Sequence, residues 1–351
     1  MKRTEIIIAE DLRTSLSEAL QKIDYDKLFV LTDENSACYC FPLICDFDEI
    51  KNAELITIKA GDLHKTLETI ADVWTYLSQN GAGRKSLLIN LGGGMVTDLG
   101  GFAASAFKRG IAYINIPTTL LGAVDAAVGG KTGINFNGLK NEIGVFNPAN
   151  AVLINSVFFR SLNRENILSG YAEMLKHGLI DNEKKRADLL RFDLNRIDYG
   201  LLQNLLITSI KVKERIVADD PYEKGIRKAL NLGHTVGHAF ESFSFEQNRP
   251  VLHGYAVAWG LICELYLSRC LTGFPSDKLR QTTRFIRDNY GTFDIDCKQY
   301  ERLYELMQHD KKNESNIINF TLLADIGDVK INQTADKELI FEMFDFYRDN
   351  L

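Results

Sequence analysis

Residues 86–105, SLLINLGGGMVTDLGGFAAS, join an apolar run to three glycines and then to a stretch of small residues. The apolar run has the composition of a buried strand, and we expect a helix to begin around Thr97 or Asp98. Glycines bring backbone N–H groups close to an oxyanion, and a helix N-terminus favours negative charge. The segment therefore indicates a dinucleotide pyrophosphate site. It lacks the GxGxxG order and the Walker A pattern, and packing alone also explains such glycines.

Similar apolar runs occur on both sides of this segment. They are KLFVLTD (27–33), ELITIKA (54–60), IAYINIP (111–117) and AVLIN (151–155), with an amphipathic stretch near 62–80 between two of them. Alternation of strands and helices predicts a parallel sheet with helices on both faces.

After about residue 160 the pattern changes to helical spacing. Apolar residues recur at this spacing in 163–180, 199–218, 227–243 and 254–272, and the late run NIINFTLLADIG (316–327) is a candidate for strands. We therefore predict an α/β domain over residues 1–155 and a mostly α-helical domain over residues 156–351.

Charge and composition exclude several classes of partner. The net charge of −6 argues against a nucleic-acid surface or an anionic membrane surface as the main partner. The apolar run near the N-terminus is too short for a signal peptide, and no later run approaches a membrane span. The 6 cysteines form no CxxC pair, so neither a disulfide framework nor a zinc ribbon is indicated. A cytoplasmic location is expected.

Residues 117–144, PTTLLGAVDAAVGGKTGINFNGLKNEIG, place lysines and an asparagine among glycines and small residues, with Lys108 and Arg109 just upstream. Such a segment suits the oxygens of a phosphorylated, hydroxylated ligand, although any single surface lysine is usually only solvated. Asp33 and Asn35 follow a predicted strand, where a carboxylate and an amide are suited to a ribose as well as to a solvated turn.

Polar residues also recur within the predicted helix over 227–243. Arg227, Asn231, His234 and His238 are separated by 4, 3 and 4 positions and would share one helical face. Burying such groups is costly unless they have partners. A metal ion and a hydrogen-bonded polar network both remain open as the partner of the two histidines.

Two further residues offer metal ligands. His253 opens the next predicted helix, and Glu173 offers a carboxylate near Lys176. Two histidines and one glutamate, with an open position, form a common catalytic divalent site. His177 could compete on spacing, but we interpret it as a histidine on a partly exposed helix; His64 and His309 are also left out of the site.

Several longer strings together resemble the 3-dehydroquinate synthase family of sugar phosphate cyclases over roughly residues 26–330. They are GGGMVTDLGGFAA (92–104), PTTLLGAVDAAVGGKTGIN (117–135), GLKNEIGVF (138–146), SGYAEMLKHG (169–178), NLGHTVGHAFE (231–241), LHGYAVAWG (252–260) and HDKKN (309–313). The resemblance implies a Rossmann-like NAD-binding α/β domain followed by a helical metal- and substrate-binding domain. It also implies a homodimer.

The resemblance further implies three groups of site residues. The expected ligands of zinc or cobalt are Glu173, His234 and His253. The expected NAD shell comprises Asp33, Asn35, Asp62, Lys65, Gly93, Gly94, Met95, Asp98, Thr118, Thr119, Lys140, Ser161 and Leu162. The expected substrate and catalytic positions are Arg109, Asp125, Lys131, Asn141, Lys176, Lys213, Arg227, Asn231, His238 and Lys311.

The implied activity converts 3-deoxy-D-arabino-heptulosonate 7-phosphate, a phosphorylated sugar acid, to 3-dehydroquinate and phosphate, a step of the shikimate pathway to aromatic amino acids. In the family, transient oxidation by NAD permits phosphate elimination, and reduction and an aldol closure follow. His238 is the expected proton-transfer group. The alternatives are another cyclase, such as 2-deoxy-scyllo-inosose synthase or 2-epi-5-epi-valiolone synthase, a related polyol dehydrogenase, or a non-catalytic NAD-binding scaffold.

Three positions depart from the family pattern. Thr97 replaces a glycine before Asp98 and is expected to supply an N-cap hydroxyl. Asp62 replaces a glutamate and keeps its charge. Tyr255 stands where an acidic residue is common, which leaves open the group that accepts the outer hydrogen bond of His253.

Overall fold

The computed structural model describes residues 4–137, 139–308 and 317–349. These form two compact units: unit 1 comprises 1–163 with 199–203, and unit 2 comprises 164–198 with 204–351. The predicted domain boundary after residue 155 stays a prediction, because compactness alone does not establish where independent folding divides. Among the described residues, no helix is both long and apolar enough to cross a membrane.

Unit 1 is built on a parallel sheet of six strands in the order β1-β8-β5-β4-β2-β3. The central strands are buried along their length, as their continuous apolar runs predict. The structure therefore confirms the predicted parallel sheet. Its strands are β1 (Glu5–Ile8), β2 (Leu28–Asp33), β3 (Glu54–Ile58), β4 (Leu87–Gly92), β5 (Ala112–Pro117) and β8 (Ala151–Ile154).

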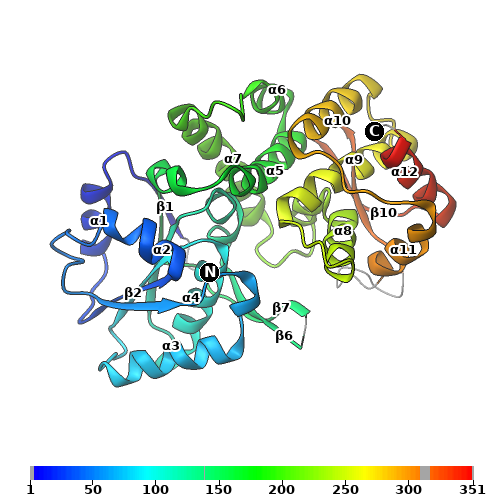
Figure 1. Cartoon of the computed structure of the whole chain (residues 1–351). Coiled ribbons are helices and arrows are strands. Elements are labelled where there is room, and N and C mark those ends of the chain that lie inside the picture. The colour runs from blue at the N-terminus through cyan, green and yellow to red at the C-terminus, as the bar shows by residue number, and fades with distance from the viewer. Residues whose placement is uncertain (1–3, 138, 309–316, 350–351) are drawn as a thin grey trace. The chain divides into compact units, whose positions relative to one another are not determined.

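Helices connect these strands, and Figure 1 shows α1 and α2 on one side of the sheet and α3 on the other. The helix after the glycine turn begins at Gly94 rather than around Thr97 or Asp98, so that prediction was wrong by one turn. The helices and short helical turns are α1 (Leu12–Gln21), α2 (Glu34–Tyr39), η1 (Phe41–Leu43), η2 (Asp62–His64), α3 (Leu67–Gln79), α4 (Gly94–Ala106), η3 (Phe107–Arg109) and η5 (Ser156–Ser161).

The strand order reverses direction between β2 and β4. The chain moves from β2 outward to β3, and then returns to place β4 on the other side of β2. In open parallel sheets, ligands bind outside the carboxyl ends of the strands at such a reversal. Asp33 ends β2 and Gly92 ends β4, so the topology puts both residues at this position.

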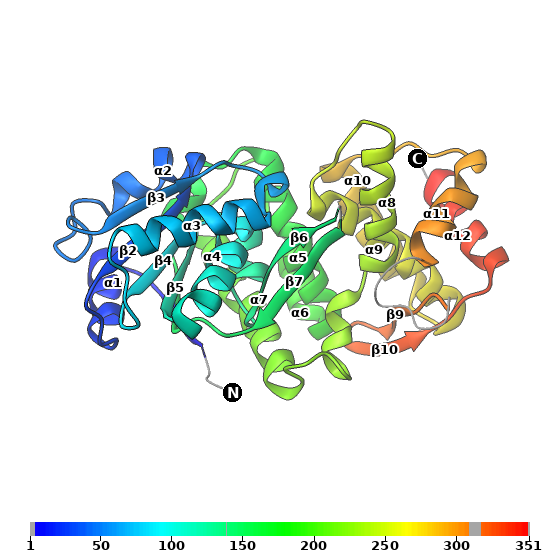
Figure 2. The same cartoon turned by 90° about the horizontal axis from the view of Figure 1, so that it is seen from below.

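The segment over 117–144 is more regular than a flexible linker. It contains a π-helical turn η4 (Gly122–Ala126) and the antiparallel strands β6 (Lys131–Phe136) and β7 (Leu139–Phe146), which form a separate ribbon (Figure 2). Gly133 and Gly144 face each other across the ribbon at a distance that leaves no room for a Cβ. The predicted lysines therefore lie on strands.

Unit 2 is mostly helical, with one two-stranded antiparallel sheet formed by the late run. One prediction needs correction: 227–243 is not a single helix, because Gly233 in the left-handed conformation separates η6 from α8. Its elements are α5 (Arg164–Asp181), α6 (Glu183–Arg191), α7 (Tyr199–Asp219, whose start belongs to unit 1), η6 (Ile226–Asn231), α8 (His234–Glu246), α9 (His253–Leu271), α10 (Ser276–Tyr290), η7 (Cys297–Gln299), α11 (Tyr300–Gln308), β9 (Phe320–Asp325), β10 (Asp328–Gln333) and α12 (Lys337–Asp349).

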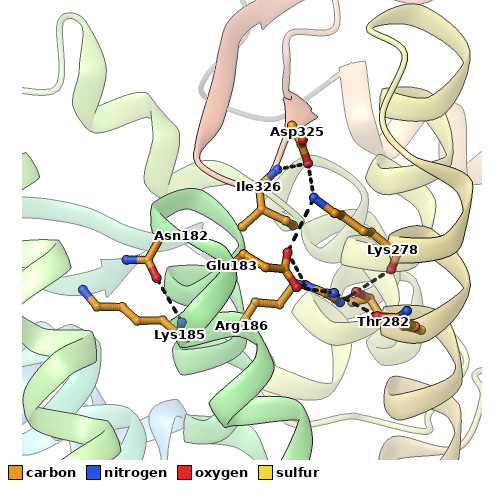
Figure 3. A network of polar contacts seen from close by, with 9 residues as sticks. Asn182, Glu183, Lys185, Arg186, Lys278, Thr282, Asp325 and Ile326 are labelled. Atoms are coloured by element: carbon orange, nitrogen blue, oxygen red, sulfur yellow. Dashed lines mark hydrogen bonds and ion pairs between the residues drawn. The ribbon is translucent and has the colours of Figure 1, made fainter.

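A polar network joins α6, α10 and the end of β9 (Figure 3). Arg186 is buried and pairs with Glu183 at 2.7 Å. Lys278 pairs with Asp325 at 2.6 Å and approaches Glu183 at 3.6 Å. Because each charge in this group has a partner of opposite sign, the elements are held together without an uncompensated buried ion.

Candidate functional site

In unit 1, the turn from β4 to α4 is packed too tightly for side chains. A Cβ on Gly92 would lie 2.5 Å from Val96, and one on Gly93 would lie 3.0 Å from Thr119. The N-cap Gly93 offers the helix no side-chain cap among the described residues, so the first N–H groups of α4 are suited to an oxyanion. The glycines of this turn are therefore suited both to close packing and to binding an anion.

Thr97 does not act as the expected N-cap. It lies within α4, is buried, and its hydroxyl donates to the carbonyl of Gly94 at 3.1 Å. The correction follows from the earlier start of the helix.

Lys65 connects two predicted residues next to this turn. Its side chain is 3% exposed, and its Nζ lies 2.5 Å from Asp98 and donates to the side-chain oxygen of Asn141. Asn141 has a φ of 50°, which is uncommon for a residue other than glycine. Lys140, predicted for the NAD shell, approaches the Asp62 carboxylate at 3.6 Å.

Other predicted NAD positions lie at the carboxyl ends of the strands. Asp33 caps α2, and its carboxylate accepts from the N–H of Ser36 at 2.7 Å. Burial raises the pKa of the Cys40 thiol, an effect that hydrogen bonds with Ser161 and Thr118 partly oppose. Asn35 lies in α2, Met95 in α4, and Leu162 directly follows η5.

The predicted substrate positions of unit 1 lie on four different elements, with Asn141 on β7. Arg109 ends η3 with a φ of 71°. Asp125 lies in η4, and Lys131 begins β6 with an exposed side chain. Left-handed backbone at a non-glycine residue costs about 1–3 kcal/mol, and such positions cluster at functional sites.

In unit 2, the three predicted metal ligands converge. Ligand atoms of Glu173, His234 and His253 all lie within 4.8 Å of one another. The Oε1 atom of Glu173 lies 3.3 Å from Nε2 of His234 and 3.5 Å from Nε2 of His253. Within the described parts of the chain this buried oxygen has no hydrogen-bond partner. A divalent cation would satisfy it, so the residues present fit a metal.

The outer nitrogens of both imidazoles are also held. Nδ1 of His253 lies 3.1 Å from the Glu241 carboxylate, and Nδ1 of His234 lies 3.1 Å from the carbonyl of Leu232. Such contacts fix the ring orientation of metal-binding histidines and direct Nε2 inward. Glu241 therefore fills the role that the departure at Tyr255 left open. Its spacing of seven from His234 on the same helix was the available sequence signal.

Charge in this cluster favours a cation. Burial alone would raise the pKa of Glu173, but the charges of Lys176 and His234 hold it well below its usual range. Burial alone would lower the pKa of His253, yet the nearby carboxylates of Glu173 and Glu241 raise it to about 10. The ionised carboxylate of Glu173 thus attracts positive charge, which a proton or a metal ion can supply.

Two of the other predicted residues, His238 and Lys176, adjoin this cluster. The His238 ring centroid lies 5.4 Å from that of His234, and Lys176 is buried beside Glu173. Lys213 is 5% exposed on α7. Lys311 lies outside the described residues.

Arg227 and Asn231 lie in η6 and not on the face of α8. Arg227 is buried and donates to the carbonyl of Pro221 at 2.6 Å. Asn231 donates to the carboxylate of Glu223 at 3.0 Å. The sequence did not single out Glu223, because its contact with Asn231 depends on the fold of this segment.

His177 is fully buried, contrary to its expected partial exposure. Its Nδ1 lies 2.7 Å from the hydroxyl of Ser209 on α7. The ring therefore joins α5 to α7 and stays outside the convergent ligand groups of the described residues.

Comparison with known proteins decides the family. Residues 55–169 match the model of the 3-dehydroquinate synthase N-terminal domain, and residues 170–313 match that of the C-terminal domain. The chain belongs to the 3-dehydroquinate synthase family. A 3-dehydroquinate synthase of Parabacteroides distasonis is 55% identical over 350 residues, which cover 100% of this chain and 99% of that protein. The predicted family is confirmed.

Solved structures of more distant cyclases share the fold. A 2-deoxy-scyllo-inosose synthase, solved with carbaglucose-6-phosphate, NAD+ and Co2+, has a TM-score of 0.85 and 23% identity over 99% of this chain and 96% of its own. The 2-epi-5-epi-valiolone synthase of Streptomyces hygroscopicus, with NAD+ and Zn2+ bound, has a TM-score of 0.87 and 20% identity over 100% of this chain and 98% of its own. The predicted fold class is confirmed.

Proposed function

We propose that the chain converts 3-deoxy-D-arabino-heptulosonate 7-phosphate to 3-dehydroquinate and phosphate, using NAD and a divalent metal. The observation that carries the proposal is the buried convergence of Glu173, His234 and His253 in a member of this family. The 55% identical relative bears the name of this enzyme, whereas the two other cyclases are 23% and 20% identical. A scaffold without catalysis would have no need of a fully buried carboxylate facing two imidazoles.

Each cofactor has a set of residues suited to it. Glu173, His234 and His253 would hold the cation, and the β4–α4 turn with Lys65 and Asp98 would hold NAD. Bound NAD would supply a transient hydride acceptor, and the bound cation would supply charge that acidifies the hydroxyl being oxidised.

The remaining residues act on the substrate directly. Arg109, Lys131 and Lys176 would neutralise its phosphate or carboxylate oxygens, and Asn141 would help to orient them. Arg227 and Asn231 would add to this recognition from η6. His238, one turn after His234 on α8, would exchange a proton with the oxygen at C5.

The test is metal-dependent phosphate release. Purified protein with NAD and Co(II) or Zn(II) is expected to release phosphate and form 3-dehydroquinate, and EDTA is expected to abolish this. The Glu173→Gln variant should lose at least about 100-fold in rate because it removes a metal-binding charge. The control Glu246→Gln alters an exposed pair with Arg302 at the other end of α8 and should keep the parent rate.

Failure of folded, NAD-bound and metal-loaded protein to release phosphate from this substrate would contradict the proposal. The 2-deoxy-scyllo-inosose synthase and 2-epi-5-epi-valiolone synthase substrates would then be assayed. Release that survives both EDTA and Glu173→Gln would contradict the metal assignment alone.

We also infer a cytoplasmic homodimer, which the family resemblance supports. Sedimentation of the purified protein should give about twice the chain mass of 39.6 kDa. A monomer at catalytic concentrations would contradict this inference.

A further inference from the structure

The N-terminus of α8 is held by a carboxylate from a different helix. Glu264, on α9, is 0% exposed and accepts the N–H of Gly233 at 2.6 Å and the N–H of Val236 at 3.1 Å. These two amides flank His234. We propose that Glu264 is a positioning residue for the metal site: it holds the first turn of α8 so that His234 meets Glu173.

The first reason is that α8 cannot cap itself. The first N–H groups of any helix lack partners within the helix, and a serine, threonine, asparagine or aspartate at the N-cap usually supplies one. The N-cap of α8 is Gly233, in the left-handed conformation with a φ of 79°, and it has no side chain to offer. Glu264 supplies both the hydrogen-bond acceptors and a negative charge at the positive end of the helix dipole.

The second reason is the cost of the carboxylate itself. A fully buried carboxylate is strongly unfavourable unless its oxygens are hydrogen-bonded. Each oxygen of Glu264 accepts from a different amide of the same helical turn. A smaller apolar residue would avoid the burial cost, but it would leave two buried amides of the His234 turn without these acceptors.

The third reason is the geometry of α9, which couples the two histidines. His253 begins α9, and Glu264 lies about three helical turns later on the same face. Between them, a Cβ on Gly260 would lie 2.0 Å from the carbonyl of Gly233, so the two backbones are in direct contact. The helix α9 therefore carries His253 at its start, and through Glu264 it also holds the turn that carries His234.

The inference rests on the proposed metal site, so the test separates the two. Co(II) affinity is measured by competition with a chromophoric chelator, and the visible absorption of bound Co(II) reports the ligand geometry. Glu264→Gln keeps the shape of the side chain but replaces one carboxylate oxygen by an NH2 group. This group would face the N–H of Gly233 or Val236 and could not accept a hydrogen bond from it. We expect its Co(II) affinity to fall about 10–100-fold, with an altered Co(II) spectrum.

A matched control distinguishes positioning from general stability. The hydroxyl of Tyr347, on α12, accepts a buried hydrogen bond from the N–H of Phe293 at 2.9 Å, and Tyr347→Phe removes this bond. The variant should have a lower thermal midpoint, while its Co(II) affinity stays within about twofold of the parent. If Glu264→Gln does not fold, Glu264→Asp, which is shorter by one methylene, is measured in its place with the same expectation.

The outcomes are distinct. Parent-like Co(II) affinity and spectrum in a folded Glu264→Gln or Glu264→Asp protein would overturn the inference, even if the thermal midpoint falls. His234→Ala should abolish tight Co(II) binding. If instead His234→Ala binds Co(II) as the parent does, the metal-ligand assignment fails, and the role of Glu264 fails with it.

Discussion

At the scale of single residues, the proposed metal site consists of buried groups of opposite charge that lie beside one another. Glu173 is 0% exposed, and its two oxygens face different groups: Oε2 accepts from Lys176, while Oε1 faces the two imidazoles. Burying any one of these charged groups alone would cost free energy, whereas burying them together lets opposite charges stabilise one another. The orientation of the rings therefore matters as much as their presence.

We predict that Glu241→Gln weakens metal binding about 10–100-fold, because the carboxylate that accepts from Nδ1 of His253 becomes a neutral amide. Competition with a chromophoric chelator for Co(II) measures this. The control is Tyr255→Phe, since the Tyr255 ring packs against Trp259 and Tyr290. An equal loss in both variants would mean that Glu241 has no special role.

At the scale of elements, the positions of the ligands follow from close contacts between helices. Glu173 lies on α5 and His253 begins α9, and these helices meet where the N–H of Gly254 donates to the hydroxyl of Ser169 at 3.1 Å. A Cβ on Gly254 would lie 1.9 Å from the carbonyl of Ser169. Glycine therefore permits the approach that brings Glu173 and His253 together.

Gly254→Ala should consequently force α5 and α9 apart, costing about 1–3 kcal/mol of stability and lowering Co(II) affinity at least about tenfold. Thermal unfolding and chelator competition measure the two effects. Gly83→Ala is the control, because its Cβ would meet only the movable carboxylate of Asp26 at 3.3 Å. A Gly254→Ala protein with parent-like stability would show that the helices can move without cost.

The end of α5 offers a pH-dependent prediction. Asp181 is 4% exposed and pairs with Lys185 at 2.7 Å and with Arg215 on α7 at 2.5 Å. Burial raises its pKa, but the hydrogen bonds and charges of Lys185 and Arg215 lower the pKa overall. A lowered pKa in the folded state means that the stabilisation is present above the unfolded-state value, about 4, and is lost as pH falls through the folded-state value.

Asp181→Asn should therefore lower the free energy of unfolding by about 1–3 kcal/mol at pH 7, and by less as the pH falls below about 4. Urea unfolding at a series of pH values measures the difference. Asp46→Asn, at a 71% exposed position, should have little effect at any pH. A difference between Asp181→Asn and the parent that stays constant down to pH 2 would contradict the assignment.

At the scale of the whole molecule, the residues proposed to bind the two cofactors are divided between two compact units. The proposed NAD residues lie in unit 1, and the proposed metal ligands lie in unit 2. Each group is organised by contacts within its own unit, such as Lys65 with Asp98 and Glu173 with His234.

We therefore predict separable binding. Gly93→Val places a branched side chain where a Cβ already lies 3.0 Å from Thr119, and should weaken NAD binding at least about tenfold. Its Co(II) affinity should remain within about twofold of the parent. Fluorescence titration with NADH and chelator competition measure the two constants, and a comparable loss of both would contradict separable binding.

Local sequence determined much of this protein. Apolar runs such as 87–92 predict buried strands wherever they occur, because burial on both faces requires such a composition. All five strands of the sheet after the first, the helical character beyond residue 160 and the start of α9 at His253 were predictable. The sequence also predicted Glu173, His234 and His253 as metal ligands. The structure brings these three residues together, and their role as ligands stays a prediction.

Only tertiary structure decided how distant residues meet. The helix break at Gly233, the outer hydrogen bond from Glu241 and the cap from Glu264 depend on α8 packing against α9. Periodicity reports which face of a helix is apolar, and it does not report where a neighbouring helix places a carboxylate. The sequence therefore predicted which residues form the proposed metal site, whereas the contacts that orient these residues arise from the packing of helices.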